Sequence, residues 1–147
     1  RHLKIMKLLY LAEREYLNEY DSLMLDDDYF SMKNGPMLSK TYDLMKRTPC
    51  QEWDSLLSRI NDNHISLKGT PTQNKLIYLN KANIKILDRV FELYGNQTAE
   101  ELIEFTHDNC PEWQETNSRI SIDIVDVLKA LGKPSEIAES INDSKRI

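Results

Sequence analysis

The sequence has 147 residues, of which 40% are hydrophobic and 29% are charged, and its formal net charge is −5. Only four glycines and five prolines occur, which argues against disordered, collagen-like and linker-dominated chains and favours one compact domain. No apolar run approaches the ~20 residues of a membrane span, and the start lacks the pattern of a secretion signal. We therefore expect a soluble cytoplasmic protein in which Cys50 and Cys110 are reduced thiols.

The negative charge lies in the later part of the chain. Residues 1–50 hold eight basic and eight acidic side chains, whereas residues 51–147 hold eleven basic and sixteen acidic ones. Because affinity for nucleic acid depends largely on neutralising phosphates, this distribution argues against autonomous DNA or RNA binding. A basic protein partner suits an acidic chain better.

The first third of the sequence predicts a helix, a strand and a second helix. Apolar residues recur at helical spacing over 3–20, and residues 28–33 read as a short strand. Gly35 can adopt a positive φ, and Pro36 suits the first turn of a helix that continues to about Arg47. The residues of that helix expected to face inward are Leu38, Tyr42 and Met45.

The middle of the sequence predicts a further helix and then a hairpin. Helical spacing returns over residues 52–60. Two β-like runs, at 65–67 and 76–79, flank a turn-rich segment at 69–72. A β-hairpin is the natural interpretation of that pattern.

Two capped helices are expected next. Asn80 can cap a helix that ends at Gly95, and Thr98 with Glu101 forms a capping box at the start of the following one. The residues of the first helix predicted to line its buried face are Ile84, Leu87, Val90, Phe91 and Tyr94.

The last part of the chain is also predicted to be helical. Residues 120–131 repeat the helical period up to Gly132, and a short final helix is expected around residues 137–141. The whole pattern predicts a predominantly α-helical α+β single domain over residues 1–147. Its small antiparallel sheet is expected to join the strand before Gly35 to the later hairpin.

Common catalytic signatures do not occur in the sequence. There is no Gly-rich phosphate loop, nucleophile elbow, His-Glu-x-x-His or Cys-x-x-Cys motif. His107, Asp108 and Cys110 could form a metal site or a Cys–His pair, but their spacing matches no specific site. We favour a structural role in which His107 ends a helix, and we expect no enzyme activity, metal or cofactor.

Acidic and aromatic clusters also have structural interpretations. The run from Asp26 to Asp28 could hold a cation, yet adjacent carboxylates point in different directions, so a solvated acidic loop is favoured. Trp53 and Trp113 are candidate anchors for a partner, although tryptophans in amphipathic patterns are more often internal. The tyrosines interpreted as packing residues rather than base-stacking residues are Tyr10, Tyr16, Tyr20, Tyr29 and Tyr42.

The order of several short motifs resembles a known family, the Panacea family, also called SocA-like or phage-associated GepA-like proteins. The first group of motifs comprises Lys7-Leu8-Leu9-Tyr10-Leu11-Ala12, Met32-Lys33-Asn34-Gly35-Pro36, Ser39 and Tyr42-Asp43-Leu44. The second group comprises Leu87-Asp88, Tyr94-Gly95, Thr106-His107, Pro111-Glu112-Trp113, and Ile122 to Leu131 followed by Gly132-Lys133. Family members carry another helical segment ahead of the Lys7 motif, so we expect residues 1–147 to lack part of it.

The resemblance implies an antitoxin. Panacea proteins are encoded beside diverse toxins, including small alarmone-synthetase-like enzymes, and neutralise them by direct protein contact. The alternative is a proteolysis adaptor that delivers the bound toxin to a AAA+ protease. In either case the partner is a protein, and any binding to operator DNA would need that partner.

The resemblance also suggests which residues matter. Six signature residues are expected to be structural: Lys7, Tyr10, Gly35, Pro36, Tyr42 and His107. Lys7 would either extend its amine to solvent or pair with a carboxylate, and His107 with Trp113 would brace the late helices against the strand and turn. The predicted partner-binding surface surrounds Tyr29, Lys33, Asn34, Lys40, Glu112 and Trp113.

Overall fold

The computed structural model describes residues 1–46, 57–61, 64–67 and 79–145, and these form a predominantly helical α+β fold, as predicted. The helices are α1 (His2–Tyr20), α2 (Ser39–Lys46), α4 (Lys81–Tyr94), α5 (Ala99–Asn109), α6 (Ile124–Ala130) and α7 (Glu136–Lys145). The strands are β1 (Tyr29–Met32), β2 (Gly35–Leu38), β3 (Leu57–Asn61), β4 (His64–Leu67) and β5 (Ile120–Ser121).

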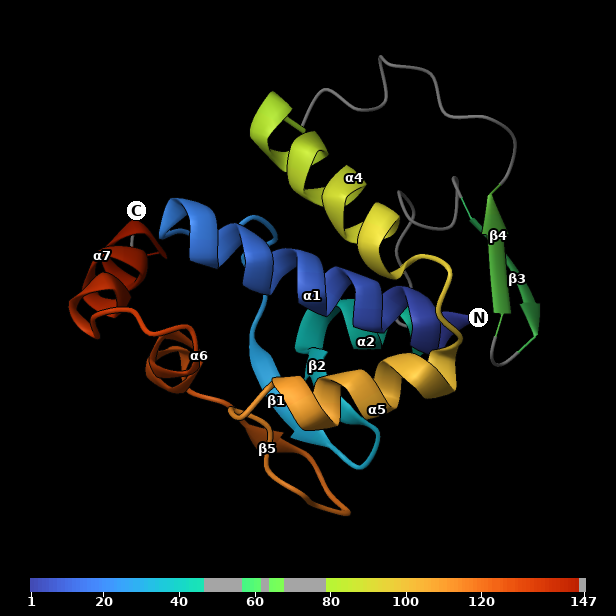
Figure 1. Ribbon diagram of the computed structural model, residues 1–147. Coiled ribbons are helices and arrows are strands. Elements are labelled where there is room, and N and C mark those ends of the chain that lie inside the picture. Colours follow the sequence, from blue (N-terminus) through green and yellow to red (C-terminus); the bar gives the residue numbers. More distant parts are fainter. Residues whose placement is uncertain (47–56, 62–63, 68–78, 146–147) are drawn as a thin grey trace.

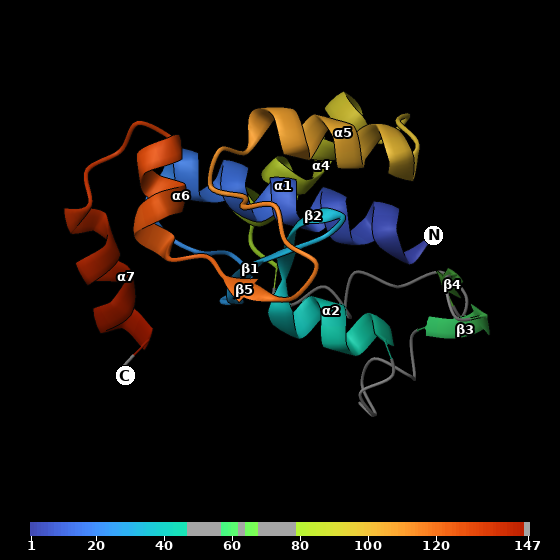
Figure 2. The same cartoon turned by 90° about the horizontal axis from the view of Figure 1, so that it is seen from below.

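Helix α1 occupies the centre of the fold. It contacts α4 and α5 as well as β2 and α2, and α6 and α7 lie toward its C-terminal end (Figure 1). Seen from below, α1 lies between α5 and the layer formed by the sheet and α2 (Figure 2). No helix among the described residues is long and apolar enough to cross a bilayer.

The main sheet has three antiparallel strands in the order β2-β1-β5. Strand β1 pairs with β2 so that Met32 lies opposite Gly35, and Phe30 lies opposite Ser121 of β5. The predicted pairing of this strand with the later hairpin is therefore wrong, because β3 and β4 form a separate two-stranded sheet. The partners of β1 come from the next segment and from a short strand about ninety residues away.

Pro36 lies in a strand instead of at the start of a helix, which corrects the prediction of a helix from Pro36 to Arg47. The helix begins only at Ser39, because the buried Asp27 carboxylate accepts hydrogen bonds from the backbone N–H groups of Lys40 and Thr41. Strand β2 is at the edge of its sheet, where the missing N–H of Pro36 is tolerated.

Two other predicted helices are corrected. Residues 57–60 belong to β3, so the predicted helix over 52–60 is wrong there, and residues 52–56 lie outside the described part. Residues 76–78 of the predicted strand at 76–79 also lie outside the described part of the chain, and Leu79 is not in a strand. The predicted helix over 120–131 begins only at Ile124, where Asp123 provides the cap.

Helices α4 and α5 begin as predicted. Asn80 and Asn83 form reciprocal hydrogen bonds at the start of α4, and Thr98 and Glu101 do the same at the start of α5. Gly132 follows α6 with a φ of 73°, and α7 includes the predicted residues 137–141.

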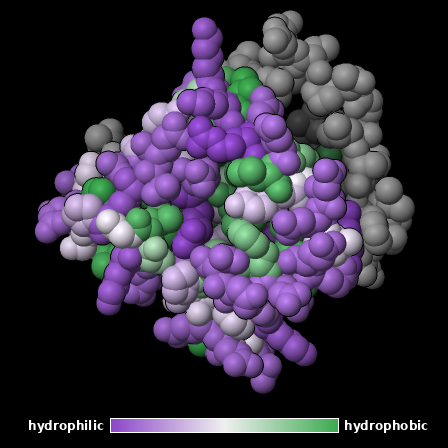
Figure 3. Space-filling model, viewed as in Figure 1, coloured by the Kyte–Doolittle hydropathy of each residue, from purple (hydrophilic) through white to green (hydrophobic). Residues whose placement is uncertain are grey.

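The buried face of α4 matches the prediction in part: Val90 is buried, and Leu87 and Tyr94 pack against the larger apolar cluster. The buried residues of α4 are Asn83, Ile86 and Val90, whereas Ile84 and Phe91 are 40% and 59% exposed. Helix α4 carries a second apolar stripe beside the face that packs on α1, and periodicity alone did not separate the two. The surface seen in Figure 3 is mostly hydrophilic, with small separate apolar patches.

The interior holds two apolar clusters. The larger one gathers residues of α1, α4, α5, α6 and α7, including Leu17, Val90, Leu102, Leu128 and Ile141. The smaller one lies beside the first turns of α1 and contains Met6, Phe30, Met37 and Met45. The polar residues described next lie where α1, the β1–β2 hairpin and α5 meet.

Candidate functional site

Lys7 places a buried amine where α1 meets the β1–β2 hairpin. Its side chain has no exposed area, and Nζ donates a hydrogen bond of 2.9 Å to the Pro36 carbonyl oxygen. The Met37 sulfur lies 3.9 Å from the same nitrogen. Burial lowers the pKa of Lys7 from its ordinary 10.5 to about 7. Both roles predicted for Lys7 are wrong, because the amine does not reach solvent and pairs with no carboxylate among the described residues.

Gly35 is required by backbone conformation and by space. Its φ of +106° is one that residues with a β-carbon rarely adopt. A β-carbon at this position would lie 2.8 Å from Lys7 Nζ, 3.1 Å from Thr106 Oγ1 and 3.2 Å from His107 Cδ2. The turn between β1 and β2 therefore packs directly against α1 and α5.

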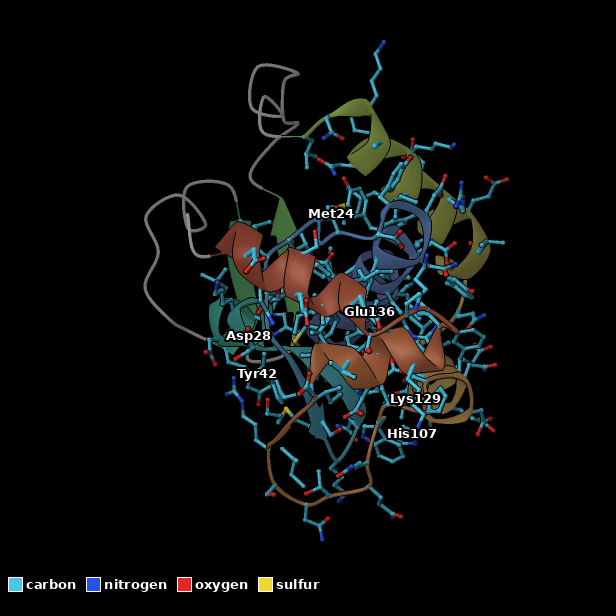
Figure 4. The ribbon with its side chains drawn as sticks, turned by 90° about the vertical axis from the view of Figure 1, so that its left-hand side faces the viewer. Met24, Asp28, Tyr42, His107, Lys129 and Glu136 are labelled. Carbon is cyan, nitrogen blue, oxygen red and sulfur yellow. The ribbon has the colours of Figure 1, made fainter. Side chains whose placement is uncertain are left out.

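His107 and Trp113 connect α5 to the end of β1. Their rings stack with centroids 3.9 Å apart and an interplanar angle of 6°. The Trp113 indole Nε1 donates a 2.8 Å hydrogen bond to the Met32 carbonyl oxygen, and burial together with the Lys7 charge lowers the pKa of His107. Figure 4 shows His107 beside α5, on the opposite side of the view from Tyr42.

Glu112 forms a buried polar cluster with two residues of α1. Its Oε2 accepts hydrogen bonds of 2.8 Å from the Tyr10 hydroxyl and from Arg14 Nε, and Oε1 accepts one of 3.2 Å from Arg14 Nη2. Burial, then the neighbouring Glu112 charge, raises the pKa of Tyr10 well above its ordinary value, so the phenol remains a donor. This cluster anchors the segment after α5 to the central helix.

Two of the residues predicted to contact a partner are internal. Tyr29 is 3% exposed and packs edge-on against Tyr10, and Glu112 is 6% exposed. Neither belongs to the exposed surface, which corrects that part of the prediction. The sequence pattern could not reveal this because the partners of Glu112 lie about a hundred residues earlier in the chain.

The other predicted contact residues lie at or near the surface. Lys33 and Asn34 are exposed in the turn between β1 and β2, and Trp113 is half-buried. Lys40 is exposed on the first turn of α2, and its Nζ donates to the Asp26 carbonyl oxygen. Tyr42, expected to be structural, is half-buried and packs edge-on against Phe30.

The surface beside Lys33 and Asn34 is hollowed. A concavity of about 220 Å³ opens between the start of α1, the β1–β2 turn and α2. Lys33, Asn34 and Tyr42 line it together with apolar residues of α1 and the hairpin.

Sequence reasoning missed two buried carboxylates. Glu13 of α1 accepts hydrogen bonds of 2.6 Å from the backbone N–H groups of Met24 and Leu25, which fixes the loop after the helix. Asp27 is buried and caps α2, so the solvated interpretation of the acidic run is wrong for this residue. Asp27 precedes the helix it caps by twelve residues, too far for a local capping signal.

The residues around Cys110 do not form an activated nucleophile. Cys110 is buried, and burial raises the pKa of its thiol to about 12, so the reactive thiolate is scarce at neutral pH. Within the described ranges, no three His, Cys, Asp or Glu side chains are placed to hold a metal ion. Cys110 packs in the larger apolar cluster.

Comparison with known proteins identifies the family. No curated protein and no solved structure shows significant similarity to this chain. The family model described as "Antitoxin SocA-like, Panacea domain" matches residues 5–114, about three quarters of the sequence. That range contains Lys7, the Gly35 turn, His107 and Glu112, the residues that join α1 to the hairpin and α5. The chain therefore belongs to the SocA-like antitoxin family defined by the Panacea domain.

Proposed function

We propose that this protein is the antitoxin of a toxin–antitoxin pair and neutralises a protein toxin, encoded by the adjacent gene, through direct contact in the cytoplasm. The observation that carries the proposal is the match of residues 5–114 to the SocA-like Panacea domain. In this interpretation the antitoxin covers a functional surface of the toxin or holds the toxin in an inactive conformation. It needs no catalytic residue of its own.

The arrangement of the polar residues supports a binding role. Lys7, Glu112 and Gly35 are buried and hold α1, the hairpin and α5 together. A rigid framework of this kind can present preorganised surface residues to a partner, which lowers the entropic cost of binding. Of the residues predicted to contact a partner, Lys33, Asn34 and Lys40 are exposed and Trp113 is half-buried.

The net charge suits a partner that handles anionic substrates. The chain carries a formal charge of −5, and a toxin that binds phosphate-rich substrates or RNA must itself present positive charge. Opposite overall charges increase the rate of association and add specificity more than affinity. An alarmone-synthetase-like toxin fits this description.

Co-expression tests the proposal directly. The adjacent gene is expressed in cells that its product alone kills, with and without this protein, and the complex is then purified through a tag on this protein. We expect growth to be rescued and the two proteins to co-purify. The absence of rescue would contradict the proposal.

The same experiment separates the two modes of neutralisation and tests for enzyme activity. Rescue accompanied by disappearance of the neighbour's product would indicate delivery to a AAA+ protease instead of a stable complex. The variant Cys110→Ser should rescue as well as the wild type, because its thiol is buried and has a raised pKa. Loss of rescue in a folded Cys110→Ser variant would point to catalysis.

A further inference from the structure

The concavity between α1, the β1–β2 turn and α2 has an apolar floor. Three methionines, Met6, Met32 and Met37, line it together with Leu3 and Tyr42. Met6 and Met37 are buried members of the smaller apolar cluster. Methionine side chains are flexible and polarisable, so a floor built from them can adapt to an inserted apolar group.

Among the described residues, the charged side chains around this floor are all basic. They are Arg1, Lys33 and Lys46, which lie on three different segments, and no acidic residue of the described ranges lines the concavity. Arg1 forms an ion pair with Glu100. Lys33 and Lys46 are exposed, and neither side chain forms an ion pair or a hydrogen bond within the part of the chain that the structure describes. In a chain of net charge −5, this is a local surplus of positive charge.

The size of the concavity limits what can occupy it. Its volume of about 220 Å³ is below the ~300–1,000 Å³ of typical small-molecule sites. It has room for a single large side chain. Protein interfaces concentrate their binding energy in such anchors, where an aromatic or apolar side chain enters a pocket surrounded by polar residues.

We propose that this concavity receives an acidic segment of a protein partner, which inserts one bulky apolar side chain against Met6, Met32 and Met37 while its carboxylates pair with Lys33 and Lys46. The methionines favour an apolar side chain at the inserted position, and the two amines favour acidic residues on either side of it. The half-buried Trp113, whose indole bonds the Met32 carbonyl oxygen, extends the contact surface next to this anchor. The inference rests on the proposed function only for the identity of the partner. A toxin whose overall charge is positive would carry this acidic segment as a local stretch of opposite sign, which meets the local basic patch of a chain that is acidic overall.

Methionine methyl signals provide a direct test, because the chain contains five methionines and three of them line the concavity. The probe is an acetylated and amidated peptide of sequence Asp-Glu-Phe-Glu-Asp, titrated into protein labelled with ¹³C at the methionine methyl groups. We expect the signals of Met6, Met32 and Met37 to shift while that of Met24 does not. Met24 packs against the other apolar cluster and stands well apart from Tyr42 in Figure 4.

Matched probes and variants test each part of the site. A peptide with alanine in place of phenylalanine, and one with lysines in place of the acidic residues, should each bind at least tenfold more weakly. The double variant Lys33→Glu/Lys46→Glu should lose at least tenfold in affinity for the first peptide. The control Lys81→Glu/Lys129→Glu makes the same change in net charge on α4 and α6 and should bind like the wild type.

Three results would overturn the proposal. The first is an equal shift of Met24 and the lining methionines, and the second is unchanged affinity in a folded Lys33→Glu/Lys46→Glu variant. The third is a lack of shifts in a longer chain that carries residues ahead of Arg1, because such a segment would then occupy the concavity itself.

The co-expression assay separates this inference from the proposed function. If wild-type protein gives no rescue, the antitoxin role fails whatever the peptides show. If the wild type rescues, and Lys33→Glu/Lys46→Glu rescues and co-purifies equally well, the antitoxin role stands and the concavity is not the contact site. Selective loss of rescue in this variant, with the Lys81→Glu/Lys129→Glu control unaffected, is the result we expect.

Discussion

Gly35 lies at the closest approach of α1, α5 and the β1–β2 turn. We expect Gly35→Ala to lower the free energy of unfolding by about 2–3 kcal/mol, because φ is strained and the new methyl group would crowd Lys7 and Thr106. Urea-induced unfolding measures the loss. Gly132→Ala is the matched control, since Gly132 also has a positive φ but no neighbouring atom within 4 Å of the place a β-carbon would take, and it should cost only about 1 kcal/mol. Equal losses would show that crowding at Gly35 is unimportant.

Lys7 should make stability depend on pH. The folded-state pKa of about 7 is below the ordinary 10.5, so between these values the unfolded chain binds more protons than the folded chain. Stability therefore rises with pH across this window, by at most ~1.4 kcal/mol per pH unit, and the contribution is constant below pH 7. Unfolding by guanidinium at pH 7, 8 and 9 should show the rise in the wild type and not in Lys7→Met.

The upper limit of pH 9 keeps an opposing effect small. The Cys110 thiol has its pKa raised from 9.0 to about 12, so as the pH approaches and passes 9 the unfolded chain loses protons that the folded chain retains, and stability falls. Lys81→Met, which removes an exposed amine at the start of α4, is the control and should keep the wild-type slope. Parallel pH profiles for the wild type and Lys7→Met would contradict the assignment.

Glu112 should matter more for stability than its hydrophilic character suggests. Its side chain is fully buried and pairs with an Arg14 side chain that is 17% exposed. Glu112→Gln leaves that guanidinium without its carboxylate, and we expect a loss of about 3 kcal/mol, measured by thermal unfolding. Glu100→Gln breaks the exposed pair with Arg1 and should have little effect. A small loss for both variants would show that the buried pair contributes nothing.

Residue-scale prediction succeeded where the cause is local. Gly35 was predicted to be able to adopt a positive φ, because it is a glycine at the end of a strand-like run, and its φ is +106°. The burial of Lys7 was not predicted, because the oxygen that accepts its hydrogen bond is the Pro36 carbonyl, twenty-nine residues away. Glu112 was placed on the surface because nothing near it in the sequence signals Tyr10 or Arg14.

At the scale of elements, α2 depends on a carboxylate outside it. Asp27→Ala removes the acceptor for the backbone N–H groups of Lys40 and Thr41, and a lost cap of this kind costs about 1–2 kcal/mol. We expect faster amide hydrogen exchange at Lys40 and Thr41, with α5 unaffected. Thr98→Ala, which removes the cap of α5, should produce the reverse pattern. If either variant accelerated amide hydrogen exchange equally in α2 and α5, the substitution would be destabilising the whole fold instead of one helix end.

The two kinds of cap explain why the starts of α4 and α5 were predictable and the start of α2 was not. Helices α4 and α5 carry capping boxes whose partners are three residues apart, so their starts can be read from short windows. The start of α2 depends on Asp27, which precedes the helix by twelve residues in the sequence. It also depends on the position of β2 at the edge of its sheet, where a strand can contain Pro36. Strands β3 and β5 have helix-like spacing, and only their pairing partners determine that they are strands.

At the scale of the whole molecule, the fold extends beyond the part that matches the family. Residues 5–114 match the Panacea domain, yet β5 pairs with β1, and side chains of α6 and α7 enter the larger apolar cluster. The fully or nearly fully buried residues contributed by these two helices are Val127, Leu128, Ala138 and Ile141. This arrangement could not be inferred from periodicity, which indicates an apolar face but not what it packs against.

A chain shortened to residues 1–114 should therefore fail to fold cooperatively. Burying one large aliphatic side chain stabilises a fold by about 1.5–3 kcal/mol, so losing Val127, Leu128 and Ile141 removes an amount comparable to the ~5–15 kcal/mol of a typical domain. Strand β1 would also lose one of its two partners. We expect weak near-ultraviolet circular dichroism and a broad urea transition, whereas a chain ending at Lys145 should behave like the intact protein. The contrary result is a sharp urea transition in the 1–114 chain, with a slope of unfolding free energy against urea concentration that fits a chain of that length. It would show that the family-matched part folds by itself and does not need α6 and α7.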